Sequence, residues 1–346
     1  MLLSKLILFA VGFLIFLPGL CQEDSVKFVK NRYVTDFPNH FNLGPVLKQR
    51  NLFFDVASIR DPEKKLTFKP NSSYSLGLSL NIFETGIEAS MSIPINVKNQ
   101  ERFGFSTVRD IQINTISKRW LLDAYHQKYS GFYSSNPQIT PPNNQPYPHR
   151  DDLQTRNFGL SFSYIFNADK FSLKSAYLFT EQQHSSRGSF LFSYIISSFN
   201  LTADSALIPK TERSNFGKGS SAYDMRFTSL GIGPGYSYNL VYKKFFLNLT
   251  LSIGPAHYWV RYTEEGGAVR NDIRISTFQS ARTGIGYNGD HFYGGINVSS
   301  QSREVKFEEL KFSTTISTFR LVLGYRFKEI GILKKRILDY TPFKKK

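Results

Sequence analysis

The sequence has little cysteine and tryptophan, and beyond its N-terminal segment it contains no long apolar run. There is one Cys and there are two Trp among 346 residues. A single Cys excludes a disulfide-stabilised scaffold and any cysteine-rich metal site. A membrane protein built from helices needs several apolar stretches of about 20 residues. These absences exclude two broad classes of protein.

Aromatic residues and positive charge are abundant instead. The chain has 32 Phe and 19 Tyr, and 43 basic against 27 acidic residues give a net charge of +16. So many aromatic side chains can bury enough apolar surface to fold, which argues against a disordered chain. The basic residues are spread along the sequence without one aromatic-interleaved cluster, so we predict no nucleic-acid partner.

Residues 1–21 have the features of a secretory signal peptide. Lys5 precedes a charge-free stretch of about a dozen residues, which is too short to span a bilayer but suits an export signal. We predict cleavage between Cys21 and Gln22. The alternative is that Cys21 becomes a lipid-anchored first residue, although lipoprotein signals prefer a small residue where Leu20 stands.

The rest of the chain is dominated by an alternation of apolar and polar residues. In the clearest runs, Phe, Leu, Ile or Tyr at every second position faces mostly Gly, Ser or Asn at the positions between them. These runs cover residues 74–82, 157–166, 229–240, 245–254 and 319–327. Weaker runs start near Phe53, Ile87, Ile111, Leu121, Phe171, Phe190, Ala281 and Phe292. This period predicts β-strands with two different faces, and no stretch predicts an amphipathic helix.

The length of the runs and the composition of the polar face indicate a barrel in a membrane. Strands of a soluble sandwich usually have five or six residues, whereas a tilted transmembrane strand needs about 9–11. A face of Gly, Ser and Asn suits a narrow barrel interior, and unpaired backbone groups in lipid require the sheet to close. We therefore predict an all-β, antiparallel, up-and-down transmembrane β-barrel of about 12 strands, with a range of 10–14. A secreted soluble β-sandwich that serves as a binding module is the alternative.

The predicted barrel covers residues 46–328, after an N-terminal periplasmic segment at 22–45 and before a basic tail at 329–346. Composition predicts tight hairpin turns at residues 167–170, Lys243–Lys244 and 288–290. A long polar segment lies at residues 134–154. Counting strands back from the C-terminus places this segment at the periplasmic end, where loops are usually short.

Six charged residues fall on the polar faces of their runs, so we expect them in the lumen: Glu88, Asp110, Lys174, Arg282, Arg320 and Arg326. A basic side chain that faces lipid at mid-depth costs about 2–4 kcal/mol, which favours the inward placement. Acids and bases can then pair across the lumen and brace it. The alternative is that the excess of Arg forms an anion-preferring constriction.

The last run ends in Leu323, Tyr325 and Phe327, which resembles the terminal strand that the barrel-assembly machinery recognises. We expect this machinery as a partner during biogenesis and outer-membrane lipid as a partner afterwards. The basic tail could lie on anionic headgroups. It could equally be a solvated chain end.

Several segments resemble an uncharacterised family of envelope proteins. They are residues 66–71 with 76–78, residues 120–133, and residues 231–236 with 243–246 and 254–255. The chain resembles the proteins grouped as domain of unknown function 4421 over about residues 26–327. The resemblance implies an outer-membrane β-barrel of a Gram-negative bacterium, and it implies no substrate.

Motifs for catalysis or cofactor binding are missing from the sequence. There is no nucleophile elbow, phosphate-binding loop, zinc-protease motif or EF-hand loop, so we predict no cofactor and no metal. We expect a non-enzymatic barrel that serves small-solute passage, envelope structure or surface interaction. The alternative is an outer-membrane lipid hydrolase acting on phospholipid or lipid A acyl chains. It would use His126 with Ser130 and Asn136, or His184 with Ser185.

Overall fold

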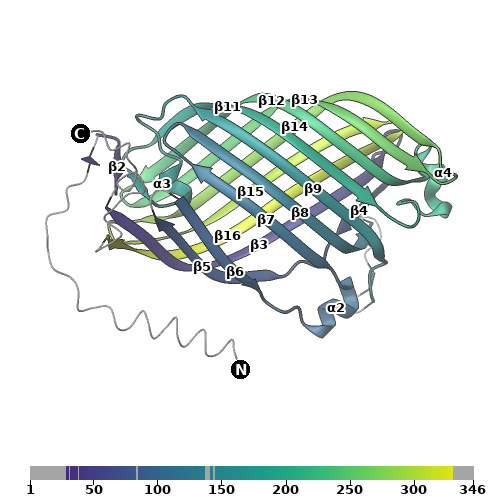
Figure 1. Cartoon of the computed structure of the whole chain (residues 1–346), viewed down its shortest axis with the longest axis horizontal. Coiled ribbons are helices and arrows are strands. Elements are labelled where there is room, and N and C mark those ends of the chain that lie inside the picture. Colours follow the sequence, from purple (N-terminus) through teal and green to yellow (C-terminus); the bar gives the residue numbers. More distant parts are fainter. Residues whose placement is uncertain are drawn as a thin grey trace, which may run out of the picture.

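The computed structural model describes residues 29–30, 32–37, 39–82, 85–136, 141–142 and 145–329. The expected signal peptide, its cleavage site at Cys21 and Gln22, and residues 330–346 of the basic tail lie outside the described residues. The described chain forms an antiparallel β-barrel with strongly tilted strands (Figure 1). The prediction of an all-β antiparallel barrel is therefore confirmed.

Ten strands form a closed ring, because the last strand pairs with the first long one. In order around the ring, they are β3 (His40–Ser58), β4 (Lys65–Lys69), β8 (Trp120–Ser135), β9 (His149–Ile165), β11 (Arg187–Thr202), β12 (Ala222–Tyr242), β13 (Phe245–Glu264), β14 (Val269–Asn288), β15 (Phe292–Phe307) and β16 (Leu310–Lys328). Strand β3 begins six residues before the predicted start of the barrel at residue 46.

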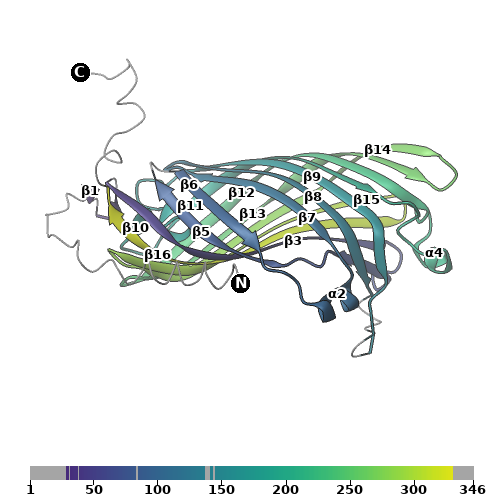
Figure 2. The ribbon, with the colours of Figure 1, turned by 60° about the horizontal axis from the view of Figure 1, so that its bottom comes forward.

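Between β3 and β8, the wall is formed by different strands at its two ends. The short strand β4 pairs with both of them toward Ser58 of β3. Toward His40, β3 pairs with β5 (Tyr74–Ile82), β5 pairs with β6 (Thr85–Ser92), and β7 (Thr107–Ile116) pairs with β8 (Figure 2). Within the described chain no ladder joins β6 to β7. The wall thus has ten strands at one level and twelve at the other, where an open seam separates β6 from β7.

We call the half of the barrel near His40 and Lys328 the terminal half, and the half near Ser58 and Leu310 the distal half. In the terminal half the polar face points inward, as predicted. On β13 the outward Leu249 and Leu251 are 51% and 52% exposed, whereas the inward Thr250 and Ser252 are buried. Small polar side chains therefore line the lumen here.

In the distal half the two faces exchange their polarity. On the same strand β13, Tyr258, Val260 and Tyr262 are buried inside, and Arg261 is exposed outside. A large cluster of aromatic and aliphatic side chains fills this half of the interior. At its centre, the Phe54 ring lies 4.9–6.2 Å from four other rings, those of Phe68, Phe132, Phe199 and Phe312. The expectation of an apolar outer face is wrong for this half, because alternation alone does not say which face is inside.

Two of the predicted hairpin turns are confirmed, whereas residues 167–170 form a turn that leads into the interior of the barrel and not a hairpin. Lys243–Lys244 joins β12 to β13, and residues 289–291 join β14 to β15. Residues 166–186, which we call the plug segment, connect β9 to β11 and contain α3 (Lys174–Tyr177) and β10 (Glu181–Gln183). The run near Phe171 is therefore not a wall strand, because Phe171 and Leu173 bury their side chains against Leu121 and Ile165 inside the terminal end of the barrel.

This difference changes the sidedness of the loops. With one wall strand fewer, Ser135 and His149, which flank the polar segment of residues 136–148, lie at the distal end of the barrel, away from His40 and Lys328, and not at the terminal end as counted. The distal end also carries η1 (Lys210–Glu212), α4 (Arg213–Phe216) and α2 (Val97–Phe103) in its connections. A separate small sheet of β1 (Val29–Lys30), β2 (Val34–Asp36) and β10 lies at the terminal end. No helix in the described chain combines the length and the apolarity needed to cross a membrane.

Candidate functional site

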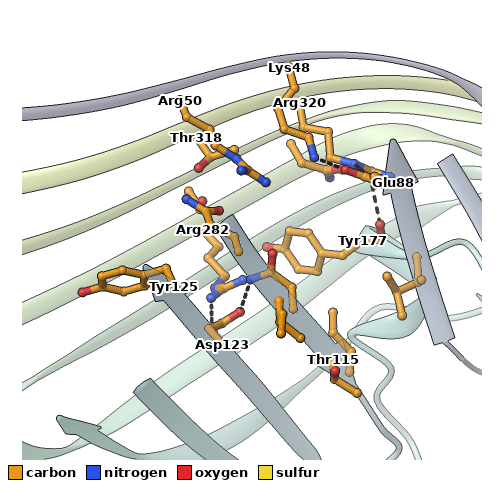
Figure 3. A pocket seen from close by; sticks show the side chains of 18 of the residues that line it. Lys48, Arg50, Glu88, Thr115, Asp123, Tyr125, Tyr177, Arg282, Thr318 and Arg320 are labelled. Carbon is orange, nitrogen blue, oxygen red and sulfur yellow. Dashed lines mark hydrogen bonds and ion pairs between the residues drawn. The ribbon is translucent and has the colours of Figure 1, made fainter. Parts of the chain in front are cut away.

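A cavity of about 380 Å³ occupies the lumen of the terminal half. Side chains from opposite walls of the barrel converge on it (Figure 3). Four cations and two carboxylates line it: Lys48, Arg50, Arg282 and Arg320, with Glu88 and Asp123. The alternation of β3, β6, β8, β14 and β16 directs these side chains inward, because residues two apart share one face of a strand.

Glu88 of β6 is bound by two cations from the neighbouring part of the wall. The Arg320 Nε donates a hydrogen bond to Glu88 at 2.6 Å, and the Lys48 Nζ forms a second ion pair with it. Arg320 also donates to the Asn297 side chain at 3.1 Å and to the Tyr177 carbonyl at 3.3 Å. This cluster ties the edge strand β6 to β3, to β16 and to the plug segment.

Asp123 of β8 forms the second charged cluster. It pairs with Arg282 of β14 across the lumen, as Figure 3 shows. The Ser161 hydroxyl donates to the same carboxylate at 3.3 Å, and the Asn114 amide of β7 donates to its other oxygen. Asp123 and Arg282 are both largely buried, with side chains 5% and 13% exposed. A buried pair of this kind is stable only when its remaining polar atoms are also satisfied.

Asp110 of β7 holds a third cluster at the distal side of the cavity. It accepts hydrogen bonds from Gln127 at 2.7 Å and from the Tyr129 hydroxyl at 3.1 Å. Arg50 of β3 pairs with it at 3.5 Å, while the Arg50 Nε has no hydrogen-bond partner among the described residues. With Asp110 included, four cations face three carboxylates, so the cavity has one positive charge in excess.

The plug segment closes the terminal side of the cavity. Side-chain amides on the polar faces of wall strands donate to its backbone carbonyls: Asn42 to Phe179 at 3.0 Å, Asn239 to Ser172 at 2.8 Å, Asn288 to Ser175 at 2.8 Å, and Asn297 to Ala176 at 3.1 Å. Fully buried Arg326 donates to the Phe179 carbonyl at 2.7 and 2.9 Å. Each buried carbonyl left without a donor would cost about 1–3 kcal/mol, so these side chains fix the plug in place.

The aromatic cluster of the distal half closes the opposite side. Phe54, Phe68, Phe132 and Phe312 are each at most 2% exposed. Protein interiors of this kind are packed to the density of organic crystals. The lumen is therefore filled both above and below the cavity.

The cavity borders the seam between β6 and β7. Ile87 of β6 pairs with Leu80 and Ile113 of β7 pairs with Ala124, so both side chains point to the outer face of the wall. They are 55% and 59% exposed, and both line the cavity together with inward residues such as Glu88 and Asn114. Residues from both faces of two unpaired edges thus border the cavity at the seam.

A family model described as "Domain of unknown function (DUF4421)" matches residues 24–327. The chain belongs to this family. No curated protein matches the chain.

Three solved structures that match the chain are distant from it in sequence. The outer-membrane protease OmpT from Escherichia coli matches with a TM-score of 0.40 and 10% identity, covering 88% of this chain and 99% of that one. Ail of Yersinia pestis in complex with sucrose octasulfate matches with a TM-score of 0.25 and 10% identity, covering 82% and 99%. A FadL homologue of Pseudomonas aeruginosa matches with a TM-score of 0.22 and 9% identity, covering 83% and 90%.

The structure places all six charged residues singled out in the sequence inside the barrel of this DUF4421 member, but not all in one site. Glu88, Arg282 and Arg320 line the cavity, Asp110 lies behind Arg50, and Arg326 anchors the plug. Lys174 lies on α3 and not on a strand, where it pairs with Glu181 at 3.1 Å.

Lys48, Arg50 and Asp123 were missed, although the sequence contains a signal for each. Lys48 and Arg50 continue the face of Val46 and Leu52 on β3, and Asp123 shares the face of Gln127 on β8.

Of the residues proposed for a lipid hydrolase, His126 and Ser130 are too far apart to act together. His126 and Ser130 lie four residues apart on β8, which separates them by about 13 Å along the strand, far beyond the reach of a base that activates a nucleophile. The His184 ring hydrogen-bonds to Thr35 at 2.6 Å. The described residues contain no cluster of three or more potential metal ligands.

The terminal-strand residues lie where β16 closes the barrel against β3. The Phe327 ring stacks on Phe41 of β3 at 5.2 Å and contacts Tyr325 at 4.8 Å. Leu323 is 58% exposed on the outer face. Whether the assembly machinery reads this strand stays a prediction.

Proposed function

We propose that this protein is an integral outer-membrane β-barrel without enzymatic activity, and that it takes up a small amphiphilic molecule from the membrane through the seam between β6 and β7. The apolar outer face of the terminal half supports the placement in a bilayer. On β12, outward apolar side chains continue from Leu230 to Tyr242, and about 9–11 residues of a tilted strand suffice to cross the hydrocarbon.

One observation carries the proposal: the cavity is bordered by outward apolar side chains at the seam and by charged side chains inside. Ile87 and Ile113 can contact an apolar tail, while Arg50, Arg282 and Arg320 lie where a polar head would arrive. The excess of one positive charge and the unpartnered Arg50 Nε favour an anionic head such as a carboxylate. Because the plug and the aromatic cluster fill the lumen on both sides, the lateral path is favoured over a continuous pore.

The unpaired strand edges support the proposal that water or a bound molecule lies in the seam. Both edges, residues 85–92 of β6 and 107–116 of β7, expose backbone N–H and C=O groups that no neighbouring strand satisfies within the described chain. Each such group costs several kcal/mol in hydrocarbon, and irregular edges at membrane depth are tolerated only where they are buried in protein or line a cavity that contains water. The seam therefore suits the passage of molecules that carry a polar head.

Cross-linking the seam tests the proposal. We expect a bifunctional thiol reagent on the variant Ile87→Cys/Ile113→Cys to slow binding of a fluorescent long-chain fatty acid in nanodiscs at least tenfold. The single variants, treated with the same reagent, account for modification of one introduced Cys without a cross-link. Tyr238→Cys/Leu249→Cys is the matched control, because these two outward residues face each other across the fully paired β12–β13 ladder.

Conductance in planar bilayers provides the second measurement. Because the lumen is filled on both sides of the cavity, we expect the wild-type barrel to carry almost no steady current. A stable ohmic current, together with fatty-acid binding that the seam cross-link does not change, would replace the lateral path with a solute pore.

A further inference from the structure

A row of five basic residues and one asparagine crosses the outer surface of the barrel on six neighbouring strands. The pairing register places Arg109 opposite Lys128, Lys128 opposite Arg156, Arg156 opposite Asn200, Asn200 opposite Arg226, and Arg226 opposite Arg261. We call the five charged residues the cation row. At about 4.8 Å between strands, the row with Asn200 extends over about 24 Å. The row cannot be recognised in the linear sequence, because residues that are neighbours in it, Asn200 included, lie 19–44 positions apart in the chain.

The row faces outward and borders a hollow. Arg109, Arg156, Arg226 and Arg261 are exposed, and Lys128 is half-buried. A surface hollow of about 430 Å³ is lined by Lys128 and the last three of these arginines. Asp224 is the one acidic residue in its lining.

No internal partner neutralises the row. Among the residues that the structure describes, none forms a salt bridge with any of the five cations, although fifteen other ion pairs are present. Like charges that face each other directly across a ladder destabilise a sheet. Arg226 donates a hydrogen bond to Asn200 at 2.5 Å, which orders the side chain but does not change its charge. The row is therefore unfavourable unless it binds anions.

The row lies where the outer face changes from apolar to polar. Two residues closer to the terminal end, Ile111, Phe158 and Trp259 are 67%, 47% and 46% exposed on the same outer face. Apart from the plug segment, which folds into the barrel, the connections at the terminal end are short turns such as Lys243–Lys244. The ends of β8 and β9 and the long connection of residues 203–221 lie at the distal end. In outer-membrane barrels the short turns are periplasmic and the long loops extracellular. The row thus lies at the headgroup level of the outer leaflet.

We infer that the cation row binds the phosphate groups of a phosphorylated glycolipid of the outer leaflet, with the acyl chains of this lipid lying on the apolar surface beside Phe158 and Trp259. Arginine matches phosphate oxygens with two parallel hydrogen bonds, whereas a lysine acts as a point charge. The inference rests on the outer-membrane placement proposed above, but it does not depend on the cavity or on the seam.

The test uses the full-length exported protein in detergent and measures its binding to bisphosphorylated lipid A by native mass spectrometry. We expect Arg156→Gln/Arg226→Gln/Arg261→Gln to weaken lipid A binding at least tenfold. The control variant Arg60→Gln/Arg270→Gln/Arg274→Gln removes the same charge from exposed arginines of the distal half that already pair with Glu309, Glu264 and Asp272. It should bind lipid A as the wild type does.

Two further probes separate phosphate recognition from nonspecific attraction. Dephosphorylated lipid A should bind the wild type as weakly as lipid A binds the triple variant, and inorganic phosphate should compete only at much higher concentration. Any of three results would overturn the inference. The two triple variants could lose lipid A binding equally, dephosphorylated lipid A could bind the wild type as tightly as lipid A does, or inorganic phosphate could compete at the same concentration as lipid A. If the folded wild-type barrel inserts into liposomes but shows no phosphate-dependent binding, the proposed role of the cation row is refuted and the membrane placement is not. Failure of the wild type to insert would refute the membrane placement.

Discussion

The two halves of the barrel share the same strands and the same alternation, but their polarity is opposite. On β13 the inward residues change from Thr250 and Ser252 in the terminal half to Tyr258 and Tyr262 in the distal half. The outward residues change from Leu249 to Arg261. The switch occurs within single strands and without a break in the hydrogen-bonded ladder between β13 and β14.

Under the proposed placement in a membrane, the difference follows from what lies outside each half. In lipid, the apolar face of a strand is stable on the outside, and the interior can be filled with polar groups that hydrogen-bond to each other and to a plug. In water, the same sheet needs a buried apolar core, because burying apolar surface is the main favourable contribution to folding. The distal half therefore resembles the inside of a soluble protein, while the terminal half holds the cavity.

The largest expected effect is a substitution at the centre of the distal core. Phe54→Ala removes a fully buried ring that contacts four other rings. We expect a loss of about 3–5 kcal/mol in the free energy of unfolding, since a large aromatic side chain leaves a cavity in a well-packed core. Urea titration of the barrel refolded in liposomes, followed by tryptophan fluorescence, measures this loss.

The matched control for Phe54→Ala is Phe158→Ala in the terminal half, whose ring is 47% exposed on the outer face. This variant should lose much less stability, because lipid chains can fill the vacated space. Equal losses for the two variants would mean that the halves do not differ in the way proposed.

An intermediate effect is expected when a charge is placed on the outer face. Leu249→Arg puts a guanidinium on the apolar surface of the terminal half, which should cost about 2–4 kcal/mol near mid-depth of a bilayer. Thr263→Arg, further along the same strand in the distal half, should change the unfolding free energy by less than about 0.5 kcal/mol. Unfolding titrations of both variants in liposomes locate the boundary of the membrane on β13. Similar losses for both would move that boundary past Thr263.

The smallest effect concerns acid sensitivity at the distal loops. Glu265 accepts two hydrogen bonds from Arg213 at 2.8 Å, and these lower the pKa of the Glu265 carboxyl to about 2. A lowered pKa means that the contact contributes its full stability above the ordinary carboxyl pKa of 4.5 and loses it as the pH falls through about 2. The carboxyl-carbon chemical shift of Glu265 should therefore titrate near pH 2.

The variant Arg213→Gln is the control for this titration, since it removes the main donor and should move the Glu265 titration from about pH 2 toward pH 4.5, while the Ala206 backbone N–H still donates to the carboxylate. A wild-type titration near pH 4.5 would show that the contact between the loop of residues 203–221 and the turn of residues 265–268 does not persist in solution.

The sequence predicted much of the fold because alternation is a local property. The runs at residues 157–166 and 245–254 are strands with the predicted apolar outer face, and Lys243–Lys244 is the predicted turn. Phe171 was assigned to a strand because the period of a short apolar run does not distinguish a wall strand from a segment that buries the same side chains inside. The distal half was misjudged for the same reason.

The candidate site was only partly predictable. Glu88, Arg282 and Arg320 were placed on the polar faces of their strands, which is a local inference, and all three line the cavity. That Asp123 faces Arg282 across the lumen depends on the curvature and closure of the sheet. The open seam was not predicted either. It exists because β4 pairs directly with β8 in the distal half, although β5, β6 and β7 come between them in the sequence and lie between β3 and β8 in the terminal half.

By itself, the sequence determined that this protein is an aromatic-rich antiparallel barrel of the DUF4421 family, since strand length and alternation depend only on neighbouring residues. The tertiary structure decided which face is inside in each half, where the plug segment lies, and which cations share a row. These features depend on register and closure, which bring together residues such as Arg109 and Arg261 that are 152 positions apart in the chain. A pairwise attraction or repulsion exists only once the sheet has fixed the distance between its partners.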